Sequence, residues 1–338
     1  DEIRAMALNI YMEQSAVRDG VTAEEVKGIL LGMASGQETL LGYFRRFIRN
    51  FEKRVGINRT VGSLRAYSNA YSHIERFLQA QYKLSDIPFS ALDRSFIDKY
   101  DLYLRTERNL APGTIINLTV QLKTIVGEAI ADGIITASPF MGYEPVRPKH
   151  VQKYLTAEEL HRIMTTPLHR QPLYHVRDMF LFSCFTGIPY GDMRLLTKDN
   201  LCLAEDGIWW IKSARQKTKI EFEIPLLDLP LQILKKYSGT APGDKLLPMY
   251  CNSTLNLYLK EIARICHIDR PLVFHAGRHT YATEITLSHG VPLETVSRML
   301  GHSQIETTQI YAKVTDEKID ADTKALNRKI SERFSVVI

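Results

Sequence analysis

A histidine and an arginine in the last third of the chain are spaced to act together on a phosphate. His275 and Arg278 stand three residues apart in His-Ala-Gly-Arg, which places both side chains on one face of a helix. A guanidinium can hold the charge that grows on a phosphate during in-line attack, and an imidazole can pass a proton. Alone, the pair also fits an ordinary surface helix, so its meaning depends on the residues further along the chain.

A second histidine and a tyrosine stand at a separation that a straight helix does not close. His302 ends Leu-Gly-His, and Tyr311 comes nine residues later. At a rise of about 1.5 Å per residue the two would lie about 14 Å apart, so the chain must bend if they act together. Ser303-Gln-Ile-Glu306 predicts a capping box between them. A tyrosine at helical spacing is usually a packing residue when it is viewed alone.

The same region offers one metal alternative, which the sequence argues against. His275 and His279 are four residues apart, the spacing of a helical zinc pair. A metalloprotease helix would have glutamate directly after the first histidine, where this chain has Ala276, and no thiolate or carboxylate clearly completes a ligand set. We therefore expect no metal and no cofactor.

Length and composition predict an ordinary protein of two domains. The chain has 338 residues, of which 45% are hydrophobic and 24% charged, and it contains no long apolar run, so no membrane span is expected. Its four cysteines form no Cys-x-x-Cys unit, which predicts reduced thiols in a cytoplasmic protein. The net charge of +5 permits a nucleic-acid partner without requiring one. The first residue is Asp1 instead of Met, which suggests a fragment.

Helical patterns fill the first part of the sequence, and no strand pattern interrupts them. Residues 1–33 are helix-compatible and include a capping box at Thr22-Ala-Glu-Glu25. Four longer patterns with apolar residues at helical spacing come next, the last beginning with a first-turn proline. They cover Thr39–Val55, Thr60–Tyr82, Ser90–Thr106 and Pro112–Asp132.

The second part mixes helices with a small sheet. Residues 138–154 contain prolines, which forbid a continuous helix, and basic residues, so they predict an interdomain linker. Thr156-Ala-Glu-Glu159 then predicts a capping box, and His175–Phe185 predicts an apolar helix. Ile208–Lys212 and Glu221–Ile224 predict antiparallel strands joined by a basic hairpin, after which helical patterns resume.

The order of these residues along the chain indicates a function more strongly than any one of the motifs does. His275-x-x-Arg278, then Leu-Gly-His302, then Tyr311, all after a hairpin that bears Lys217, closely resembles the signature of the tyrosine recombinase family, also called phage-type integrases. The strings that extend the resemblance are Phe185-Thr-Gly187, Gln216-Lys-Thr218, Ile224-Pro-Leu226 and Gln309-Ile-Tyr311. The resemblance covers residues 1–330 and looks closest to integrases of conjugative transposons. It implies a mainly α fold with a small antiparallel β-sheet, in two domains, one helical and one mixed α/β and catalytic.

The resemblance also implies a reaction and a role for each residue. Tyr311 would displace a 5′ hydroxyl and leave a 3′-phosphotyrosyl link, which keeps the phosphodiester energy so that rejoining needs no ATP or metal. Arg278 and His302 would hold the non-bridging oxygens, His275 would assist proton transfer at the tyrosine, and Lys217 would protonate the leaving oxygen. These roles suit the residue types, because a phenol with a pKa of about 10 needs help to ionise and an ammonium is a competent acid.

One departure from the family pattern concerns a second arginine. The family has an arginine two residues after Thr-Gly, where this chain has Pro189, while Asp192 matches the acidic position that comes next in the pattern. Proline cannot bind a phosphate, and losing such a donor typically costs about 2.7 to 4 kcal/mol of transition-state stabilisation.

Three arginines are candidates to replace the missing one. Integrases similar to this chain that lack the usual arginine tend to keep one at the position of Arg177, so Arg177 is preferred, although it lies about 18 Å upstream along a straight helix. Arg215 is the next candidate, because it would share a strand face with Lys217, and Arg194 is the third. By the same strand argument Lys219 would point to the side of Lys217, which leaves the choice of lysine open.

The resemblance implies double-stranded DNA as the partner and a homotetramer on paired sites, and it leaves a host DNA-bending factor open. It divides the chain into a helical coupler (1–35), a helical core-type DNA-binding domain (36–137), a basic linker (138–154), a catalytic domain (155–330) and a C-terminal tail (331–338). The basic residues that we expect along the DNA are Arg45, Arg49, Arg147, Lys149, Lys153, Arg215 and Lys219.

Other interpretations stay open at this point. Because of Pro189, the chain would be a catalytically silent DNA-binding protein on the same fold if no other arginine takes over. A metal-dependent nuclease that uses the histidines would be sensitive to EDTA and would leave free ends. A type IB topoisomerase shares the phosphotyrosyl chemistry, but the transposon-like strings favour exchange between paired sites.

Overall fold

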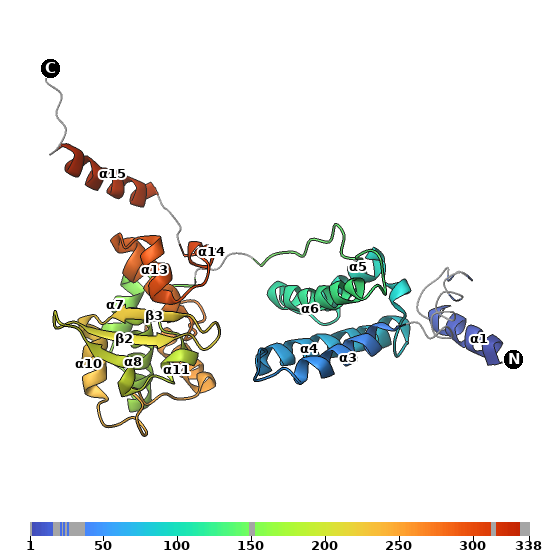
Figure 1. Ribbon diagram of the computed structural model, residues 1–338, viewed down its shortest axis with the longest axis horizontal. Helices are drawn as coiled ribbons and strands as arrows, with labels where there is room; N and C mark the ends of the chain where they lie inside the picture. The colour runs from blue at the N-terminus through green and yellow to red at the C-terminus, as the bar shows by residue number, and fades with distance from the viewer. Residues whose placement is uncertain are drawn as a thin grey trace, which may run out of the picture. The chain divides into compact units, whose positions relative to one another are not determined.

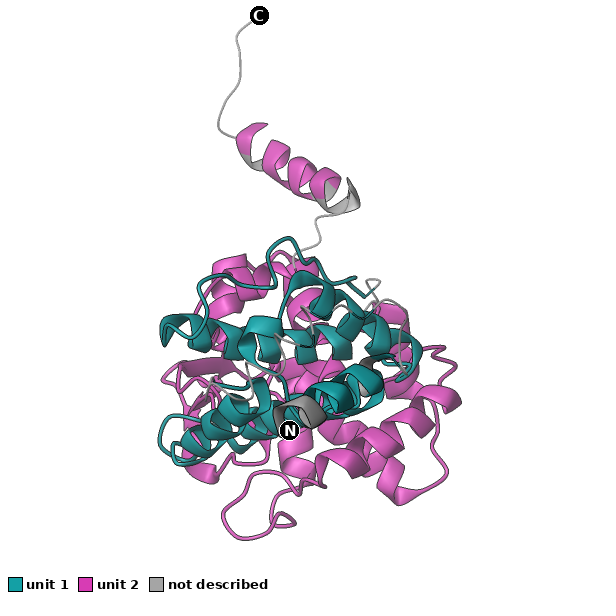
Figure 2. Ribbon diagram, turned by 90° about the vertical axis from the view of Figure 1, so that its right-hand side faces the viewer, with its two compact units in different colours: residues 1–150 teal, residues 151–338 magenta. Residues whose placement is uncertain are grey.

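The chain forms two compact units in the computed structural model, residues 1–150 and residues 151–338 (Figures 1 and 2). The structure describes residues 2–15, 21, 23, 26, 38–148, 153–311 and 316–331. Each unit has a hydrophobic core of its own.

The described part of the first unit is helical. Its elements are α1 (Glu2–Ser15), α3 (Leu40–Glu52), α4 (Val61–Phe77), the π-helical turn η1 (Leu78–Tyr82), the 3-10 turn η2 (Phe89–Ala91), α5 (Arg94–Thr106) and α6 (Pro112–Ala131). Helices α3, α4, α5 and α6 therefore lie where the apolar periodicity predicts them. The capping box expected at residues 22–25 lies outside the described residues.

Two features stabilise the helices of this unit. They bury an apolar face, and α4, α5 and α6 begin with a residue that suits the unpaired N–H groups of a first turn. Leu40, Leu41 and Phe44 of α3 are at most 1% exposed, while Arg45 and Arg49 on the same helix face solvent. Side chains of Thr60 and Asp93 accept backbone N–H groups at the starts of α4 and α5, and α6 begins with a proline. Helix α4 packs against α3 and α6, and α6 against α5, which closes the core (Figure 1).

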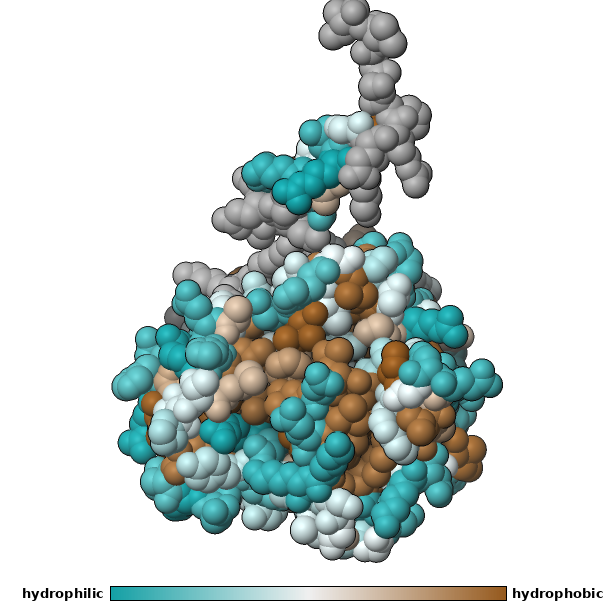
Figure 3. Space-filling view, turned by 90° about the vertical axis from the view of Figure 1, so that its left-hand side faces the viewer, coloured by the Kyte–Doolittle hydropathy of each residue, from teal (hydrophilic) through white to brown (hydrophobic). Residues whose placement is uncertain are grey.

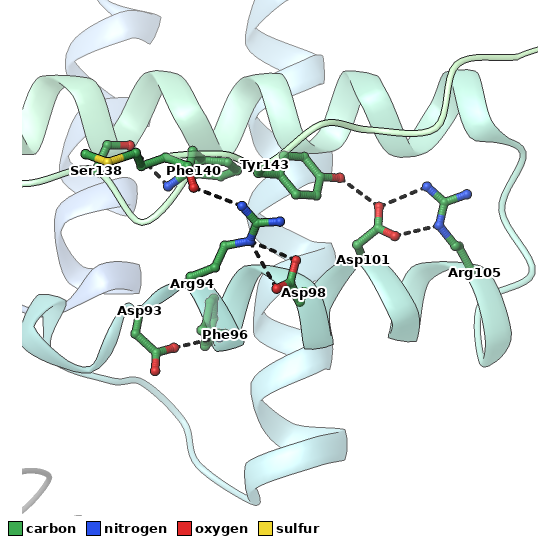
Figure 4. Close-up of polar contacts among 10 residues, drawn as sticks. Asp93, Arg94, Phe96, Asp98, Asp101, Arg105, Ser138, Phe140 and Tyr143 are labelled. Carbon is green, nitrogen blue, oxygen red and sulfur yellow. Dashed lines mark hydrogen bonds and ion pairs between the residues drawn. The ribbon is translucent and has the colours of Figure 1, made fainter.

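The segment after α6 belongs to the first unit for longer than the sequence suggests. Phe140 is 4% exposed and packs into the helical core, and Tyr143 packs beside it. The hydroxyl of Tyr143 donates a 2.7 Å hydrogen bond to Asp101 on α5 (Figure 4). The predicted linker at residues 138–154 thus begins too early. Pro139 and Pro145 prevent a helix in this segment, but the aromatic side chains between them still pack into the core.

The second unit contains helices around a small sheet. Its elements are α7 (Ala157–Thr165), α8 (Gln171–Thr186), α9 (Tyr190–Met193), η3 (Lys198–Asn200), β1 (Leu201–Leu203), β2 (Trp209–Ala214), β3 (Glu221–Pro225), α10 (Asp228–Lys236), α11 (Asn252–Ile265), α12 (Ala276–Thr280), η4 (Tyr281–Thr286), η5 (Leu287–His289), α13 (Leu293–Leu300), α14 (Glu306–Gln309) and α15 (Asp316–Ser331). The predicted mainly helical fold with one small antiparallel sheet is confirmed.

The sheet has the order β1-β2-β3, with both pairs antiparallel (Figure 1). Ile211 and Ile224 are paired across β2 and β3 and are both buried, which sets the register of the hairpin. Residues 215–219 form a turn instead of a strand, and Lys219 adopts a left-handed backbone with φ of 60°. The argument that Lys217 and Lys219 point to the same side of a strand is therefore wrong.

Helix α8 is the centre of the second unit. It packs against α7, α10, α11 and α12, and a helix covered on so many sides must be apolar nearly all round. It ends at Gly187, whose φ of 69° lies in the left-handed region. A Cβ on Gly187 would lie 2.5 Å from a ring carbon of Tyr281, so only glycine fits this helix end.

Two predicted capping boxes had different outcomes. Thr156 and Glu159 form theirs at the start of α7, as predicted. The one expected from Ser303 to Glu306 does not form, because the N-cap of α14 is Ile305 in place of Ser303 and no side chain caps the helix. The reason is tertiary: the chain must turn sharply after α13 before α14 can start.

Among the described residues, the exposed hydrophobic side chains identify no partner. Large hydrophobic side chains such as Leu203, Leu227 and Leu257 are exposed, and Figure 3 shows one face on which hydrophobic residues gather among hydrophilic ones. Apolar atoms contribute much of any folded surface, so such an area alone indicates no ligand. No helix in the described part of the chain is long and apolar enough to cross a membrane.

A loop carboxylate fixes the start of α3. Both oxygens of Asp86 accept backbone N–H groups of that helix, from Leu41 at 2.8 Å and from Gly42 at 3.0 Å. Orphan N–H groups in a first turn need such acceptors, and a carboxylate also interacts favourably with the helix dipole. Asp86 therefore ties the loop before α5 to the first long helix.

We expect Asp86→Ala to lower the free energy of unfolding of the helical unit by about 1 to 2 kcal/mol, because two partly buried donors lose their acceptor. Urea denaturation followed by far-UV circular dichroism measures the loss. Asp98→Ala is the matched control, since Asp98 forms only an exposed pair with Arg94 one turn away (Figure 4) and should cost about 0.5 kcal/mol at most. Equal losses in the two variants would contradict the capping role.

Candidate active site

One pocket in the second unit, of about 810 Å³, collects most of the residues that the sequence singles out. Its described lining contains no aspartate or glutamate, and a pocket with several cations and no acid suits an anion. The predicted residues that line it are Lys153, Arg215, Lys217, His275, Arg278, His302 and Tyr311.

Arg278 is the most deeply held of these residues. It lies on α12, which sits so close to α8 that a Cβ on Gly277 would be 2.9 Å from the hydroxyl of Ser183. The Arg278 side chain donates to the carbonyl of Gly187 at 2.9 Å and to that of Leu300 at 2.6 Å, and it is 3% exposed. The ends of α8 and α13 therefore fix the guanidinium.

His302 connects Arg278 to the segment that leads to the tyrosine. Its Nε2 is 2.9 Å from a guanidinium nitrogen of Arg278, and its Nδ1 is 2.7 Å from the hydroxyl of the buried Thr308. Because arginine can only donate, Nε2 must accept, so Nδ1 carries the proton in the neutral ring. Burial, followed by the charges of Arg278 and Arg215, lowers the pKa of His302 to about 4, which agrees with that neutral form.

Tyr311 reaches the pocket through the bend that the spacing requires. Helix α14 ends at Gln309, and the next turn brings the Tyr311 ring parallel to the His302 ring at 6.2 Å between centroids. The tyrosine is 6% exposed, and it partly offsets the lowering of the Arg278 pKa that burial and Arg215 cause. The predicted nucleophile, arginine and histidine are thus side by side.

His279 is the residue that the sequence analysis missed, since it was considered only as a zinc ligand. Its ring lies 5.0 Å from that of Tyr311 and 4.9 Å from that of His275. Burial, His275 and the charges of Lys153 and Arg278 lower its pKa to about 4. No group of three or more potential ligands is present among the described residues. The four-residue spacing from His275 was the available signal for a shared face.

The cationic side chains of the pocket lower the pKa values of their neighbours, because each positive charge disfavours another one nearby. Burial, then the nearby Arg215, lowers the pKa of Arg278 from 12.5 to about 10. Burial and the charges of Arg278, Arg215 and Lys153 also lower the pKa of His275. An anion in the pocket would relieve both effects, because it stabilises every charged form around it.

The structure does not bring all the predicted residues to this pocket. Arg177, the preferred replacement for the missing arginine, lies on α8 with its guanidinium over the ring of Tyr174 at 4.8 Å, and it donates to the carbonyl of Thr166. It does not line the pocket, because α8 carries it toward the other end of the helix. Arg194, at the end of α9, is exposed and outside the lining.

Most of the other basic residues that we expected along the DNA lie outside the pocket. Lys217 lines the pocket from the turn after β2, and Lys219 does not. Arg45 and Arg49 are exposed on α3, Arg147 is exposed near the end of the first unit, and Lys149 lies outside the described residues.

Comparison with known proteins decides the family. The model of the Phage integrase family matches residues 153–318, and that of the Phage integrase SAM-like domain matches residues 39–145. The chain belongs to the tyrosine recombinase family of phage-type integrases. As a tyrosine recombinase it is an enzyme of DNA recombination.

Several recombinases are similar to this one over most of their length. The tyrosine recombinase XerD of Listeria monocytogenes is 26% identical over 273 residues, which are 76% of this chain and 89% of that protein. XerD of Staphylococcus saprophyticus is 26% identical over 297 residues, 83% of this chain and 96% of that protein.

Solved structures share the fold. The Tn1549 transposon integrase in complex with transposon right end DNA has a TM-score of 0.67 at 18% identity, over 86% of this chain and 99% of that one. A lambda integrase tetramer bound to a Holliday junction has a TM-score of 0.67 at 16% identity, over 93% of this chain and 87% of that one. The recombinase fold predicted from the sequence is confirmed.

We expect the second unit to lose stability as the pH falls from about 6.5 toward about 4. His279 and His302 have folded pKa values of about 4, below the unfolded value of about 6.5, so in this window the unfolded chain binds more protons. Urea midpoints at pH 7.5 and pH 5, followed by the fluorescence of Trp209 and Trp210, measure the effect.

The histidine contribution is separated from that of the carboxylates by two variants. His279→Asn should reduce the difference between the two midpoints, whereas His161→Asn, at an exposed position on α7, should leave it unchanged. An unchanged difference in His279→Asn would show that this histidine is not held neutral by the fold.

Proposed function

We propose that this recombinase cuts and rejoins DNA at Tyr311 and thereby integrates or excises a mobile element. The observation that supports it most is the meeting of Tyr311, Arg278 and His302 in a basic pocket without acidic residues in its described lining. A phenol beside a fixed guanidinium is placed to attack a bound phosphodiester, because the cation attracts the phosphate and stabilises charge on its oxygens.

In the proposed reaction the Tyr311 oxygen forms a bond to phosphorus while the bond from phosphorus to the 5′ oxygen breaks. The phenolic proton passes to the neutral pair of His275 and His279. The ring of His279 lies between the ring of His275 and that of Tyr311. Lys217 returns a proton to the 5′ oxygen. Attack by that hydroxyl on the phosphotyrosyl bond reverses the step, so no ATP, metal or other cofactor is required.

Arg278 and His302 would hold the non-bridging oxygens. Arg278 is already oriented by two backbone carbonyls and so needs little reorganisation when a phosphate arrives. A phosphate would raise the pKa of His302, which then takes up a proton and can donate to a second oxygen. Thr308 would position His302 by its bond to Nδ1.

The remaining assignments belong to the same proposal. The helical domain at residues 36–137 would bind core-type DNA through the exposed Arg45 and Arg49 of α3, the linker through Arg147, Lys149 and Lys153, and the hairpin through Lys219. Residues 1–35 would be the coupler segment, and residues 155–330 would be the catalytic domain. The lambda integrase tetramer on a Holliday junction supports four protomers on paired duplexes.

A catalytically silent DNA-binding protein is the second candidate. One observation favours it: Pro189, which begins α9, stands where the family has a cation. A host DNA-bending factor would be compatible with either candidate.

We expect the wild-type protein to form a covalent DNA adduct that Tyr311→Phe does not form, because phenylalanine has no oxygen to attack phosphorus. To find a substrate, the wild-type protein is incubated with sheared genomic DNA of its source organism and then denatured in SDS. Duplex DNA that stays attached to the denatured protein is recovered and used as the substrate. A nicked version of that duplex then traps the adduct for gel analysis. Tyr258→Phe, on α11 and outside the pocket, should react like the wild type.

Two results would contradict this function. Retention of no DNA by the wild-type protein would favour the silent DNA-binding protein. Cleavage that EDTA abolishes, with free ends in place of an adduct, would favour a metal-dependent nuclease.

We expect Lys217→Ala to slow adduct formation by about 10² to 10⁴, the range for loss of a general acid. Lys235→Ala, at an exposed position on α10 outside the pocket lining, is the control and should change the rate about threefold at most. A substrate with a 5′-bridging sulfur tests the role, because a thiolate leaves without a proton. If Lys217→Ala loses as much on the sulfur substrate as on the oxygen substrate, Lys217 is not the acid.

A further inference from the structure

The proposed reaction develops more negative charge on the phosphate than one arginine can stabilise. During attack by tyrosine, negative charge develops on two non-bridging oxygens, and Arg278 is a single cation buried among backbone groups. Pro189 supplies no donor from the start of α9. An active enzyme therefore needs a second fixed cation that faces the same phosphate.

Arg215 reaches the position next to Arg278 from the opposite side. It is the first residue of the turn after β2, and its Nη1 donates to the carbonyl of Leu300 at 3.2 Å. Arg278 donates to the same carbonyl at 2.6 Å. Two guanidinium groups that share one acceptor lie within reach of one ligand, and both line the pocket.

A buried carboxylate holds Arg215 in this place. Its Nε lies 2.8 Å from Oδ2 of Asp192, and the two side chains are 15% and 4% exposed. The other oxygen of Asp192 accepts the backbone N–H of Gln216 at 2.9 Å, so the same acid fixes the side chain and the turn that bears it. Asp192 comes from α9, three residues after Pro189, at the place where the missing arginine would have entered.

The surrounding backbone makes room for this side chain. A Cβ on Gly301 would lie 2.9 Å from Cγ of Arg215, and Gly301 has a φ of 63°, so glycine is needed both for the turn after α13 and for the passage of the arginine. The charge of Arg215 also lowers the pKa of Arg278, His302 and His275, after the effect of burial on each. Arg215 therefore acts on the same pocket as these three residues.

We propose that Arg215, held by Asp192, is the second phosphate-binding arginine of this enzyme and replaces from the hairpin the cation that Pro189 cannot supply. With DNA bound, its terminal N–H groups exchange the Leu300 carbonyl for a non-bridging oxygen, while Nε stays with Asp192. Arg278 holds the same phosphate from α12. The inference rests on the proposed recombinase activity and adds one residue to it.

Arg215→Ala should slow adduct formation by about 10² to 10³, the typical effect of removing one donor to the reacting oxygens. Arg215→Lys keeps the charge but not the planar fork, so its rate should lie between those of the wild type and Arg215→Ala. Arg177→Ala is the matched control and should react within about threefold of the wild type. Binding of the intact duplex should change only a few fold in all three variants, because one phosphate contact among many is removed.

A neutral linkage separates charge stabilisation from a structural role. A methylphosphonate at the scissile position replaces one charged oxygen by a methyl group, so there is less charge for Arg215 to stabilise. The loss in Arg215→Ala should then shrink to about tenfold or less relative to the wild type on the same substrate. A merely misfolded hairpin would reduce the rate equally on both linkages.

Failure of this inference is distinguishable from failure of the proposed function. If the wild type forms no adduct, the recombinase proposal fails. If the wild type reacts but Arg215→Ala reacts within about threefold of it, or loses equally on both linkages, or if Arg177→Ala shows the larger loss, then Arg215 is not the second arginine while the recombinase proposal stands.

Discussion

The burial of the Arg278 guanidinium is the constraint on which the second unit depends. Its donors are met by the carbonyl of Gly187 and, from a distant part of the chain, by the carbonyl of Leu300 and a ring nitrogen of His302. A buried cation without such partners would be costly, so the ends of α8 and α13 must meet at this point. The site is thus built where two helices end, and their left-handed glycines make the ends possible.

Electrostatics explains why the unit is prepared for an anion. Five lysine and arginine side chains line the pocket, and the acids paired with two of them, Asp192 with Arg215 and Glu159 with Arg270, lie outside its lining. His279 and His302 are neutral at pH 7 and add no positive charge, because their pKa values are lowered to about 4. A neutral imidazole can accept a proton from a phenol, whereas a protonated one cannot. The same burial that disfavours charged imidazoles therefore keeps His279 and His302 neutral, the form that the proposed reaction requires of its bases.

Prediction from the sequence succeeded where the signal was local and periodic. The long helices of the first unit, the cap at Thr156 and the antiparallel strands follow from spacing and from turn residues. It failed where the outcome depended on contacts between distant residues. Phe140 and Tyr143 pack into the first unit despite neighbouring prolines, and the cap expected at Ser303 gives way to the turn that leads toward Tyr311.

The sequence by itself determined the residue types and their order, from the hairpin lysine to the final tyrosine, because that order is covalent and needs no contact to be recognised. Only the tertiary structure decided which arginine stands beside Arg278. The family resemblance in the sequence favours Arg177 over Arg215, but α8 directs Arg177 to Tyr174, while Asp192 and Gly301 admit Arg215 to the pocket. The direction of a side chain depends on the packing of elements far apart in sequence, and spacing within one segment does not contain it.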